Sequence, residues 1–415
     1  MKRLLNWLSR RRFPYVPLIN VEISRSRLLD NLAAFQSYVN KLVPGAMVAP
    51  VLKSNAYGHG LFEVAGILEH VPNIPFFVVD SYFEAVALRM HGAKVPTLII
   101  GYTRPETIAH SRLSSTSFTI TSIDLLRRFH PDAPPCPDAI DTDSPGKYSI
   151  PHSRRILINL KIDTGMRRQG ILPSEIDEAI GIIKENHNLI LDSICTHLCD
   201  ADDADGSFTE GQINVWNRAT KQLTAAFPHI RYIHAAATDG SRLSADIAGN
   251  VVRLGIGLYG LSENQTLNAS VPLKPALSIK TIVTGVKKLA SGETIGYDNT
   301  YQAPLDMKVA TIPVGYSEGL DRRLSSGPAP AYEARGFVQV GPKHIACPII
   351  GRVSMNIASI DVTAVPGAAA GMGAAVVSDN ANDPNSIAAM ARACGTITYE
   401  TVVKIPSQLK RTVVD

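Results

Sequence analysis

The stretch MVAPVLKSNAYGHGLFEVAGILEHVPNIPFFVVDSYFEAVALRMHGAKVPTLIIG, residues 47–101, decides the fold of this chain. It holds three short apolar runs, at 47–52, 76–80 and 96–101. The longer segments between them carry apolar residues at three- and four-residue spacing, which is typical of amphipathic helices, whereas short apolar runs are typical of buried strands. The stretch therefore predicts strands alternating with helices, the pattern of a parallel sheet.

The same alternation continues outward to about residue 260. The predicted strands are 47–52, 76–80, 96–101, 117–121, 155–161, 190–197, 230–235 and 251–257. The predicted helices include 61–70, 81–92, 173–186, 208–226 and 240–248. Eight buried strands alternating with helices favour a closed (β/α)8 barrel of the TIM type, because closure leaves no exposed edge. An open doubly wound sheet is the competing architecture.

The pattern changes near residue 275, where alternating apolar and polar residues with Gly and Pro between them predict a mainly β domain. We expect a basic N-terminal extension over 1–20, the barrel over 21–274 and the β domain over 275–415. A Pro-, Asp- and Ser-rich surface insertion is expected at 131–152. Two elements are predicted near the end of the β domain, a short helix near 386–394 and a last strand near 399–405.

Composition excludes several classes of protein. The 415 residues are 45% hydrophobic and 19% charged, which is typical of a globular protein, and no apolar run reaches the eighteen residues of a membrane span. The net charge is +4, but five basic residues and no acid fall within the first twelve positions, so the remainder carries −1. A nucleic-acid partner is therefore not expected, since it would need a basic folded surface.

The N-terminus, MKRLLNWLSRRRF, has too short an apolar stretch for a secretory signal and no small-residue cleavage site. A frayed terminus is the simpler interpretation, and a short amphipathic helix on an anionic surface is the alternative. Five scattered cysteines do not form a disulfide framework in a chain of this length. A cytoplasmic location is expected.

Chemistry-bearing residues gather at the ends of the predicted strands. Lys53 follows the first strand directly, at the C-terminal rim where barrels of this kind place their active sites. Partial burial there would lower the pKa of the Lys53 amine and free it for covalent chemistry with a carbonyl group. Other strand ends hold the segment 161–170, His197, His234 and Arg253.

Six motifs along the chain resemble one known family. They are VLKSNAYGHG, KIDTGMRRQG, RLGIGLYG, IGYDNTY, VGYSEGLDRR and GRVSMN, and together they resemble the pyridoxal-phosphate-dependent alanine racemases over roughly residues 22–410. The resemblance implies a fold type III enzyme, an isomerase of a small amino acid that supplies D-alanine for peptidoglycan. It also implies a head-to-tail homodimer whose two active sites borrow side chains from the partner's β domain.

The resemblance assigns roles to three residues in the reaction. Lys53 would bind pyridoxal 5'-phosphate covalently and then act as a base on one face of the substrate Cα. Tyr297, from the partner subunit, would be the base on the opposite face, with His197 and Arg253 as cationic neighbours that favour its phenolate. Arg253 would face the pyridine nitrogen, and because a guanidinium keeps its protons, that nitrogen would stay unprotonated and transamination would be suppressed.

The remaining site residues also come from the resemblance. The cofactor phosphate would be bound by Tyr57, Thr238, Gly255, Ile256 and Tyr399. Arg168 and Met355 would contact the substrate, and Lys161, often carbamylated in the family, would hold Arg168. The resemblance places Tyr301, Asp202, Arg322 and Arg352 at the entrance of the active site. For the three charged residues, a surface salt bridge is an equally good interpretation.

Some positions depart from the usual family pattern, which places rate and substrate choice in doubt. Asn356 and Glu318 each stand where an aspartate is usual. Arg167 replaces a common glycine, and Ala237 followed by Thr238 replaces Asn-Ser.

Rival interpretations remain open. The C-x-H-x-C spacing of Cys195, His197 and Cys199 is not a standard zinc pattern, so no metal is expected. A racemase for another amino acid, such as serine or lysine, would use the same residues. A non-catalytic protein of the related single-barrel type would not need Tyr297. A decarboxylase of the same plan would be expected to present an acid, rather than Arg253, to the pyridine nitrogen.

Overall fold

The structure is a computed structural model that describes residues 16–130, 154–201, 206–326 and 333–415. It divides into two compact units. One unit spans Ser24–Ala276 together with Asp415, and the other combines the chain up to Ile23 with Leu277–Val414.

The first unit contains all eight predicted barrel strands, in the predicted order. They are β2 (Met47–Pro50), β3 (Phe77–Val79), β4 (Thr97–Ile99), β5 (Thr116–Ile120), β6 (Ile156–Lys161), β7 (Leu189–Cys195), β8 (Tyr232–His234) and β9 (Val251–Leu254). Neighbouring strands pair in parallel from β3 to β8, and β2 pairs in parallel with β9. Most of their residues are buried, which explains the continuous apolar runs in the sequence.

Hydrogen bonds join the two parallel sheets into a ring. The N–H of Leu52 donates to the carbonyl of Val78 at 2.7 Å, which connects β2 to β3. The N–H of Arg253 donates to the carbonyl of Ala236 at 3.1 Å, which connects β9 to the end of β8. The (β/α)8 barrel is therefore confirmed, and the open doubly wound sheet is excluded.

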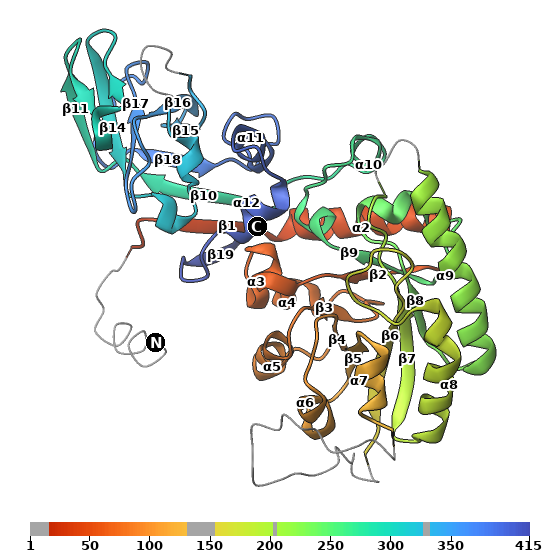
Figure 1. Cartoon of the computed structure of the whole chain (residues 1–415). Coiled ribbons are helices and arrows are strands. Elements are labelled where there is room, and N and C mark those ends of the chain that lie inside the picture. Colours follow the sequence, from red (N-terminus) through yellow and green to blue (C-terminus); the bar gives the residue numbers. More distant parts are fainter. Residues whose placement is uncertain (1–15, 131–153, 202–205, 327–332) are drawn as a thin grey trace. The chain divides into compact units, whose positions relative to one another are not determined.

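Helices cover the outside of these strands (Figure 1). Four predicted helices are confirmed, as α4 (Leu61–Leu68), α5 (Tyr82–Met90), α8 (Ile176–Glu185) and α9 (Ser207–Ala226). The unit also holds α2 (Arg25–Leu42), α3 (Lys53–Tyr57), α6 (Pro105–His110), α7 (Ile123–Arg127), α10 (Gln265–Ser270) and three short 3-10 turns, η1 (Pro173–Glu175), η2 (Asp239–Leu243) and η3 (Ile256–Tyr259).

The predicted helix at 240–248 is wrong, because only the 3-10 turn η2 forms there. Backbone N–H groups of this segment donate to carbonyls three residues back, as Ser244 does to Ser241, rather than four. The end of the segment is also hydrogen-bonded to helix α9, because the side chain of Asn217 on α9 accepts from the N–H of Ala248 at 2.8 Å. That contact removes a donor that a continuing helix would need.

The second unit is built on an antiparallel sheet, as the alternating pattern predicted. Its strand order is β11-β14-β17-β16-β15-β18-β10-β1-β19. The strands are β1 (Asn20–Ser24), β10 (Leu277–Ile282), β11 (Gly285–Leu289), β14 (Met307–Ile312), β15 (Phe337–Val340), β16 (Ile345–Ile350), β17 (Ala358–Asp361), β18 (Gly373–Val377) and β19 (Arg411–Val414), with a separate pair β12 (Thr294–Ile295) and β13 (Tyr301–Gln302). Three 3-10 turns, η4 (Tyr297–Asn299), η5 (Tyr316–Glu318) and η6 (Arg322–Leu324), and two helices, α11 (Ile387–Ala393) and α12 (Thr398–Val403), complete it.

The last strand predicted near 399–405 is wrong, because those residues form helix α12 and the last strand is β19. The β-branched residues of TYETVV suggested a strand, but Thr398 and Val402, four residues apart, are the pair that is buried. Glu400 and Lys404 form an ion pair at the same spacing, 2.7 Å between Oε1 and Nζ. Tertiary packing and this pair outweigh local strand propensity.

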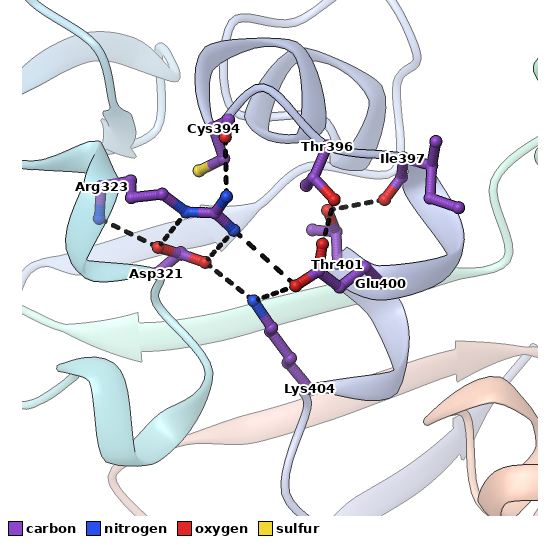
Figure 2. Close-up of polar contacts among 8 residues, drawn as sticks. All are labelled: Asp321, Arg323, Cys394, Thr396, Ile397, Glu400, Thr401 and Lys404. Atoms are coloured by element: carbon purple, nitrogen blue, oxygen red, sulfur yellow. Dashed lines mark hydrogen bonds and ion pairs between the residues drawn. The ribbon is translucent and has the colours of Figure 1, made fainter.

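A cluster of ionic contacts links α12 to η6 and to the end of α11 (Figure 2). The Asp321 carboxylate accepts two bonds from the Arg323 guanidinium, at 3.0 and 2.8 Å, and one from Lys404 at 3.1 Å. Arg323 in turn donates to the carbonyl of Cys394 at 2.8 Å. A six-residue helix is too short to be stable alone, so these contacts help to fix it in place.

Three predictions fall wholly or partly outside the described residues: the insertion at 131–152, residues 1–15 of the basic extension, and Asp202. Across the described part of the chain, no helix is long and apolar enough to span a membrane.

Candidate active site

Lys53 lies at the C-terminal rim of the barrel and opens an unusual turn. Its side chain is half-buried. The next four residues, Ser54 to Tyr57, all have left-handed backbone angles, with φ between 50° and 55°. Such a run is rare for residues other than glycine, and it points the chain sharply away from β2.

The surroundings of Lys53 lower the pKa of its amine. Burial is the main cause, and the positive charges of Arg168 and Arg253 act in the same direction. Asp80 and Glu84 oppose them. Burial and the two arginines therefore shift the amine towards its neutral, nucleophilic form, in the direction that the sequence analysis expected.

Arg253 is buried at the end of β9 and is fixed by the neighbouring strand ends. Its guanidinium donates to the carbonyls of Thr196, His234 and Ala235 at 2.8 to 2.9 Å. It also lies 2.6 Å from Nδ1 of His234 and 3.3 Å from Nδ1 of His197. A guanidinium only donates, so both ring nitrogens accept, and both histidines are neutral in this arrangement. The expectation that His197 is a cationic neighbour is therefore wrong, and Arg253 is the cation of this pair.

His197 is surrounded by cations. Burial lowers its pKa to about 3, with help from Arg253, Lys161, Arg168 and Lys53 in that order. These four cations come from β6, from the loop after it, from β9 and from the turn after β2. Their convergence concentrates basic side chains at this rim.

The hydroxyl groups of Tyr57 and Thr238 lie close to Gly255. The hydroxyl of Thr238 accepts from the N–H of Gly255 at 3.1 Å. A Cβ atom on Gly255 would lie 3.1 Å from the Tyr57 hydroxyl, so glycine keeps this space open. Tyr57 is buried against the ring of Tyr259, which fixes its orientation. Ile256 follows as the first residue of η3.

Lys161 and Arg168 flank the loop after β6. Lys161 is half-buried, and burial lowers the pKa of its amine, with Arg168 and Arg253 acting the same way. The Asp163 carboxylate folds the loop by accepting from the N–H groups of Gly165 at 2.9 Å and Arg167 at 3.0 Å. Arg168 is exposed, so its guanidinium is accessible to a ligand.

The second unit carries Tyr297 and Met355 on neighbouring loops. Tyr297 begins η4 and is 66% exposed, and Met355 is 57% exposed. The two loops touch, because a Cβ on Gly296 would lie 3.4 Å from the backbone nitrogen of Arg352. Arg352 also pairs with Asp298 at 2.9 Å, which ties the Met355 loop to the Tyr297 turn.

The other predicted positions of this unit have different surroundings. Tyr301 is buried and packs with Met307, Val309 and Ile350. Arg322 is exposed and lies between Asp321 and Arg323 of the ionic cluster. Tyr399 lies on α12, next to Glu400 of the same cluster.

Comparison with known proteins agrees with this geometry. Residues 23–263 match the family model described as alanine racemase, N-terminal domain, and residues 276–413 match the one described as alanine racemase, C-terminal domain. An alanine racemase from Lactobacillus acidophilus is 30% identical over 399 residues, which cover 94% of this chain and 96% of that protein. The chain belongs to the alanine racemase family.

Solved structures show the same fold. The alanine racemase of Clostridium difficile 630 matches with a TM-score of 0.82 at 23% identity, over 96% of each chain. A histidine racemase from Leuconostoc mesenteroides matches with a TM-score of 0.80 at 24% identity, over 97% of this chain and 99% of that one.

Two departures from the alanine racemase pattern contact each other. Nδ2 of Asn356 donates to Oε1 of Glu318 at 2.7 Å, and Oε2 of Glu318 accepts from the N–H of Gly315 at 2.9 Å. Gly315 packs so tightly under Ser354 and Met355 that a Cβ there would lie within 2.5 Å of both carbonyl oxygens. The pair thus fastens η5 to the Met355 loop.

The sequence analysis missed Asp80 and Glu84, the two acids that act on Lys53. Ser81-x-x-Glu84 is a recognisable capping box, and the structure contains it. Its relation to Lys53 depends on the packing of α5 beside the turn after β2, which no local pattern reveals. The Cys195 thiol accepts from Asn159 at 3.1 Å, and within the described ranges no group of three His, Cys, Asp or Glu side chains is arranged to bind a metal.

Proposed function

We propose that this protein is an alanine racemase that interconverts L- and D-alanine with pyridoxal 5'-phosphate as cofactor. The observation that carries the proposal is the half-buried Lys53 at the barrel rim, whose pKa is lowered by burial and by Arg168 and Arg253. An amine in this state attacks a carbonyl and later accepts a proton, which are the two tasks of a cofactor-binding lysine.

The rim fits the proposed cofactor. A phosphorylated anion matches the basic side chains around His197, and the hydroxyl groups of Tyr57 and Thr238 lie close to Gly255, which has no Cβ. Lys53 would hold the cofactor covalently, and the resemblance adds Ile256 and, from the second unit, Tyr399 to the phosphate ligands. When bound, pyridoxal phosphate supplies an electron-withdrawing ring that takes up the charge left on the substrate Cα.

Arg253 is positioned to hold the cofactor ring without protonating it. Its two Nη groups donate to backbone carbonyls and to His234 and His197. The Nε–H is therefore the donor that remains for the pyridine nitrogen. Because a guanidinium keeps its protons, Arg253 would leave the pyridine nitrogen of a bound cofactor unprotonated, which would favour reprotonation at Cα over transamination. This is also the feature that distinguishes a racemase from the decarboxylase alternative.

Racemisation needs a second base on the opposite face of Cα, and we assign this role to Tyr297 of a partner subunit. Tyr297 is 66% exposed in the single chain, and Tyr316, Met355 and Ile357 of the same unit are also exposed. Large exposed apolar groups of this kind are typical of an interface. A homodimer with shared active sites would bury them and bring Tyr297 to the other subunit's rim.

Alanine is the substrate we propose, with Arg168 and Met355 at its carboxylate end and Lys161 supporting Arg168. A racemase of another amino acid, such as serine or lysine, uses the same residues and is the second candidate, supported by the histidine racemase that shares the fold. We place the enzyme in the cytoplasm, as a source of D-alanine for peptidoglycan.

Solvent deuterium exchange at Cα tests the proposal directly. Purified wild-type protein, Lys53→Ala and Tyr297→Phe are incubated in D2O with each alanine enantiomer, and label at Cα is followed. We expect no exchange with Lys53→Ala and unequal loss in the two directions with Tyr297→Phe, because each base serves one face. Equal, unimpaired exchange in Tyr297→Phe refutes the second base, and borohydride trapping of the cofactor on another lysine refutes the anchor.

Substrate choice and the non-catalytic alternative are decided in the same assay. Serine, lysine and histidine are offered in place of alanine, and faster exchange with any of them overturns the assignment to alanine. Absence of exchange with all four, in a chain that binds the cofactor, would support the non-catalytic alternative instead.

A further inference from the structure

The turn after Lys53 is held in a costly conformation. Four consecutive residues, Ser54, Asn55, Ala56 and Tyr57, are left-handed, and none is a glycine. Each such residue is less stable than its right-handed form, so the turn needs contacts from outside itself to persist. The direction in which Lys53 leaves β2 depends on those contacts.

Asn55 is the residue through which the turn is fixed. Its side-chain oxygen accepts from the N–H of Leu61 at 2.9 Å, and its carbonyl accepts from the N–H of Gly60 at 2.9 Å. Both contacts join Asn55 to the start of helix α4. The backbone N–H of Asn55 is different, because it donates at 3.3 Å to Oε1 of Glu84, which belongs to helix α5.

The other oxygen of Glu84 is held firmly by the start of α5. Oε2 accepts from the N–H groups of Asp80 at 2.9 Å and Ser81 at 3.3 Å, while the Ser81 hydroxyl accepts from the N–H of Glu84. This capping box fixes the carboxylate at the end of β3. One oxygen therefore anchors Glu84 to a rigid helix start, and the other reaches the left-handed turn.

Glu84 also acts on the Lys53 amine through its charge, with a smaller effect than Asp80, Arg168 or Arg253. The charged groups that act on Lys53 are Asp80 and Glu84 from the β3–α5 connection, Arg168 from the loop after β6 and Arg253 from β9. The two acids raise the pKa of Lys53 and the two arginines lower it. Glu84 thus acts on Lys53 both through the backbone and through its charge.

We propose that Glu84 is a positioning residue for Lys53, one that holds the left-handed turn to the capped start of α5 and balances the cations around the amine. This rests on the proposed role of Lys53 as the cofactor-binding lysine. It assigns to Glu84 a task beyond capping a helix, because a cap alone needs only the oxygen that faces Asp80 and Ser81.

The positional part is tested with Glu84→Ala in the full-length, cofactor-loaded protein. Loss of the carboxylate removes the acceptor of the Asn55 N–H, so we expect amide hydrogen exchange at Asn55 to accelerate about tenfold or more. The matched control is Glu175→Gln, since Glu175 accepts from the N–H of Leu172 at 2.7 Å at the start of η1 and is not among the charges acting on Lys53. Unchanged exchange at Asn55 in Glu84→Ala overturns the positional role.

The electrostatic part is tested with Glu84→Gln, which keeps the size of the side chain and removes its charge. The full-length, cofactor-free chain is treated with a small acylating reagent across a pH series, and modification of Lys53 is measured by mass spectrometry. We expect the pH midpoint of Lys53 labelling to fall below that of the wild type, and Glu175→Gln to leave it unchanged. An unshifted midpoint in Glu84→Gln overturns the electrostatic role.

Failure of this inference and failure of the proposed function give different results. Borohydride reduction of the cofactor-loaded wild type identifies the lysine that carries the cofactor. If that lysine is not Lys53, the proposed function is wrong, while the labelling and exchange data still decide whether Glu84 controls Lys53. If it is Lys53 and the Glu84 variants behave as the wild type, only the positioning role is wrong.

Discussion

Asn356 and Glu318 form a hydrogen-bonded pair, with Nδ2 of the amide 2.7 Å from Oε1 of the carboxylate. In the usual family pattern both positions are aspartates. Asn356 therefore lacks an acidic group, and Glu318 has a longer acidic side chain. The structure shows that they are related: the amide supplies a donor where a second carboxylate would repel the first. The loop of Met355 is thereby tied to η5 by an uncharged donor and one acid.

Restoring the usual aspartate at position 356 should therefore be unfavourable in this chain. Asn356→Asp places two carboxylates in contact, and because the site is exposed we expect a modest loss of about 0.5–1 kcal/mol in the free energy of unfolding at pH 7. The loss should disappear at acid pH, where one carboxyl is protonated. The double variant Asn356→Asp with Glu318→Gln should regain stability, because it recreates a donor and an acceptor. Equal stability of the single and double variants at pH 7 would contradict the pairing.

Arg167 stands in a left-handed conformation, with φ of 56°, where the family commonly has glycine. Its N–H is nevertheless held at 3.0 Å by Asp163. A non-glycine residue in this conformation destabilises the folded state by roughly 1–2 kcal/mol. Glycine removes that strain, but its greater conformational freedom in the unfolded state offsets part of the gain. We expect Arg167→Gly to raise the free energy of unfolding by about 0.5–1 kcal/mol, measured by denaturant titration. Arg112→Gly is the control, because Arg112 is exposed and has no positive φ, and it should show no gain in stability. A loss of stability in both variants would contradict the inference that the backbone at Arg167 is strained.

Much of the fold was predictable because it depends on local patterns. The eight barrel strands, four of the helices and the antiparallel character of the second unit follow from apolar spacing. The helix α12 was not predicted, because its β-branched sequence favours a strand, and the burial of Thr398 and Val402 and the contacts of Lys404 favour the helix only in the folded chain. The motifs identified Lys53 and Arg253, but the contact of Glu84 with Asn55 joins residues 29 positions apart and has no local signature.

The neutral state of His197 should make the protein sensitive to acid. Burial and the nearby cations lower its pKa from 6.5 to about 3, so the folded state binds fewer protons than the unfolded state between those values. The stability that depends on neutral His197 is complete above pH 6.5 and is lost as the pH falls, by up to about 1.4 kcal/mol per pH unit. His197→Gln should therefore show a shallower decline of the free energy of unfolding between pH 6.5 and 4. Parallel declines in the two proteins would show that His197 titrates normally.

The Asp321 cluster should contribute most of its stability near neutral pH. Hydrogen bonds from Arg323 are the main cause that lowers the pKa of Asp321, and Lys404 adds to them. A lowered pKa means that the contribution is present above the ordinary pKa of an aspartate and is lost as the pH falls below it. We expect Asp321→Asn to reduce the free energy of unfolding by about 1 kcal/mol at pH 7, because solvent screens the exposed Arg323 and Lys404, and by progressively less as the pH falls below about 4.

The loss of stability in Asp321→Asn should be greatest in helix α12, which the Asp321 cluster holds. Asp321 connects η6 to Lys404 at the end of α12, so amide exchange in Asp321→Asn should accelerate over residues 398–404 more than in the central strands of the same unit. Asp306→Asn is the matched control, because Asp306 accepts only a backbone N–H, from Ser291 at 2.9 Å, among the contacts of the described chain. If the two variants lose the same stability, or if the loss in Asp321→Asn persists in acid, the ion pairs of the cluster do not hold α12.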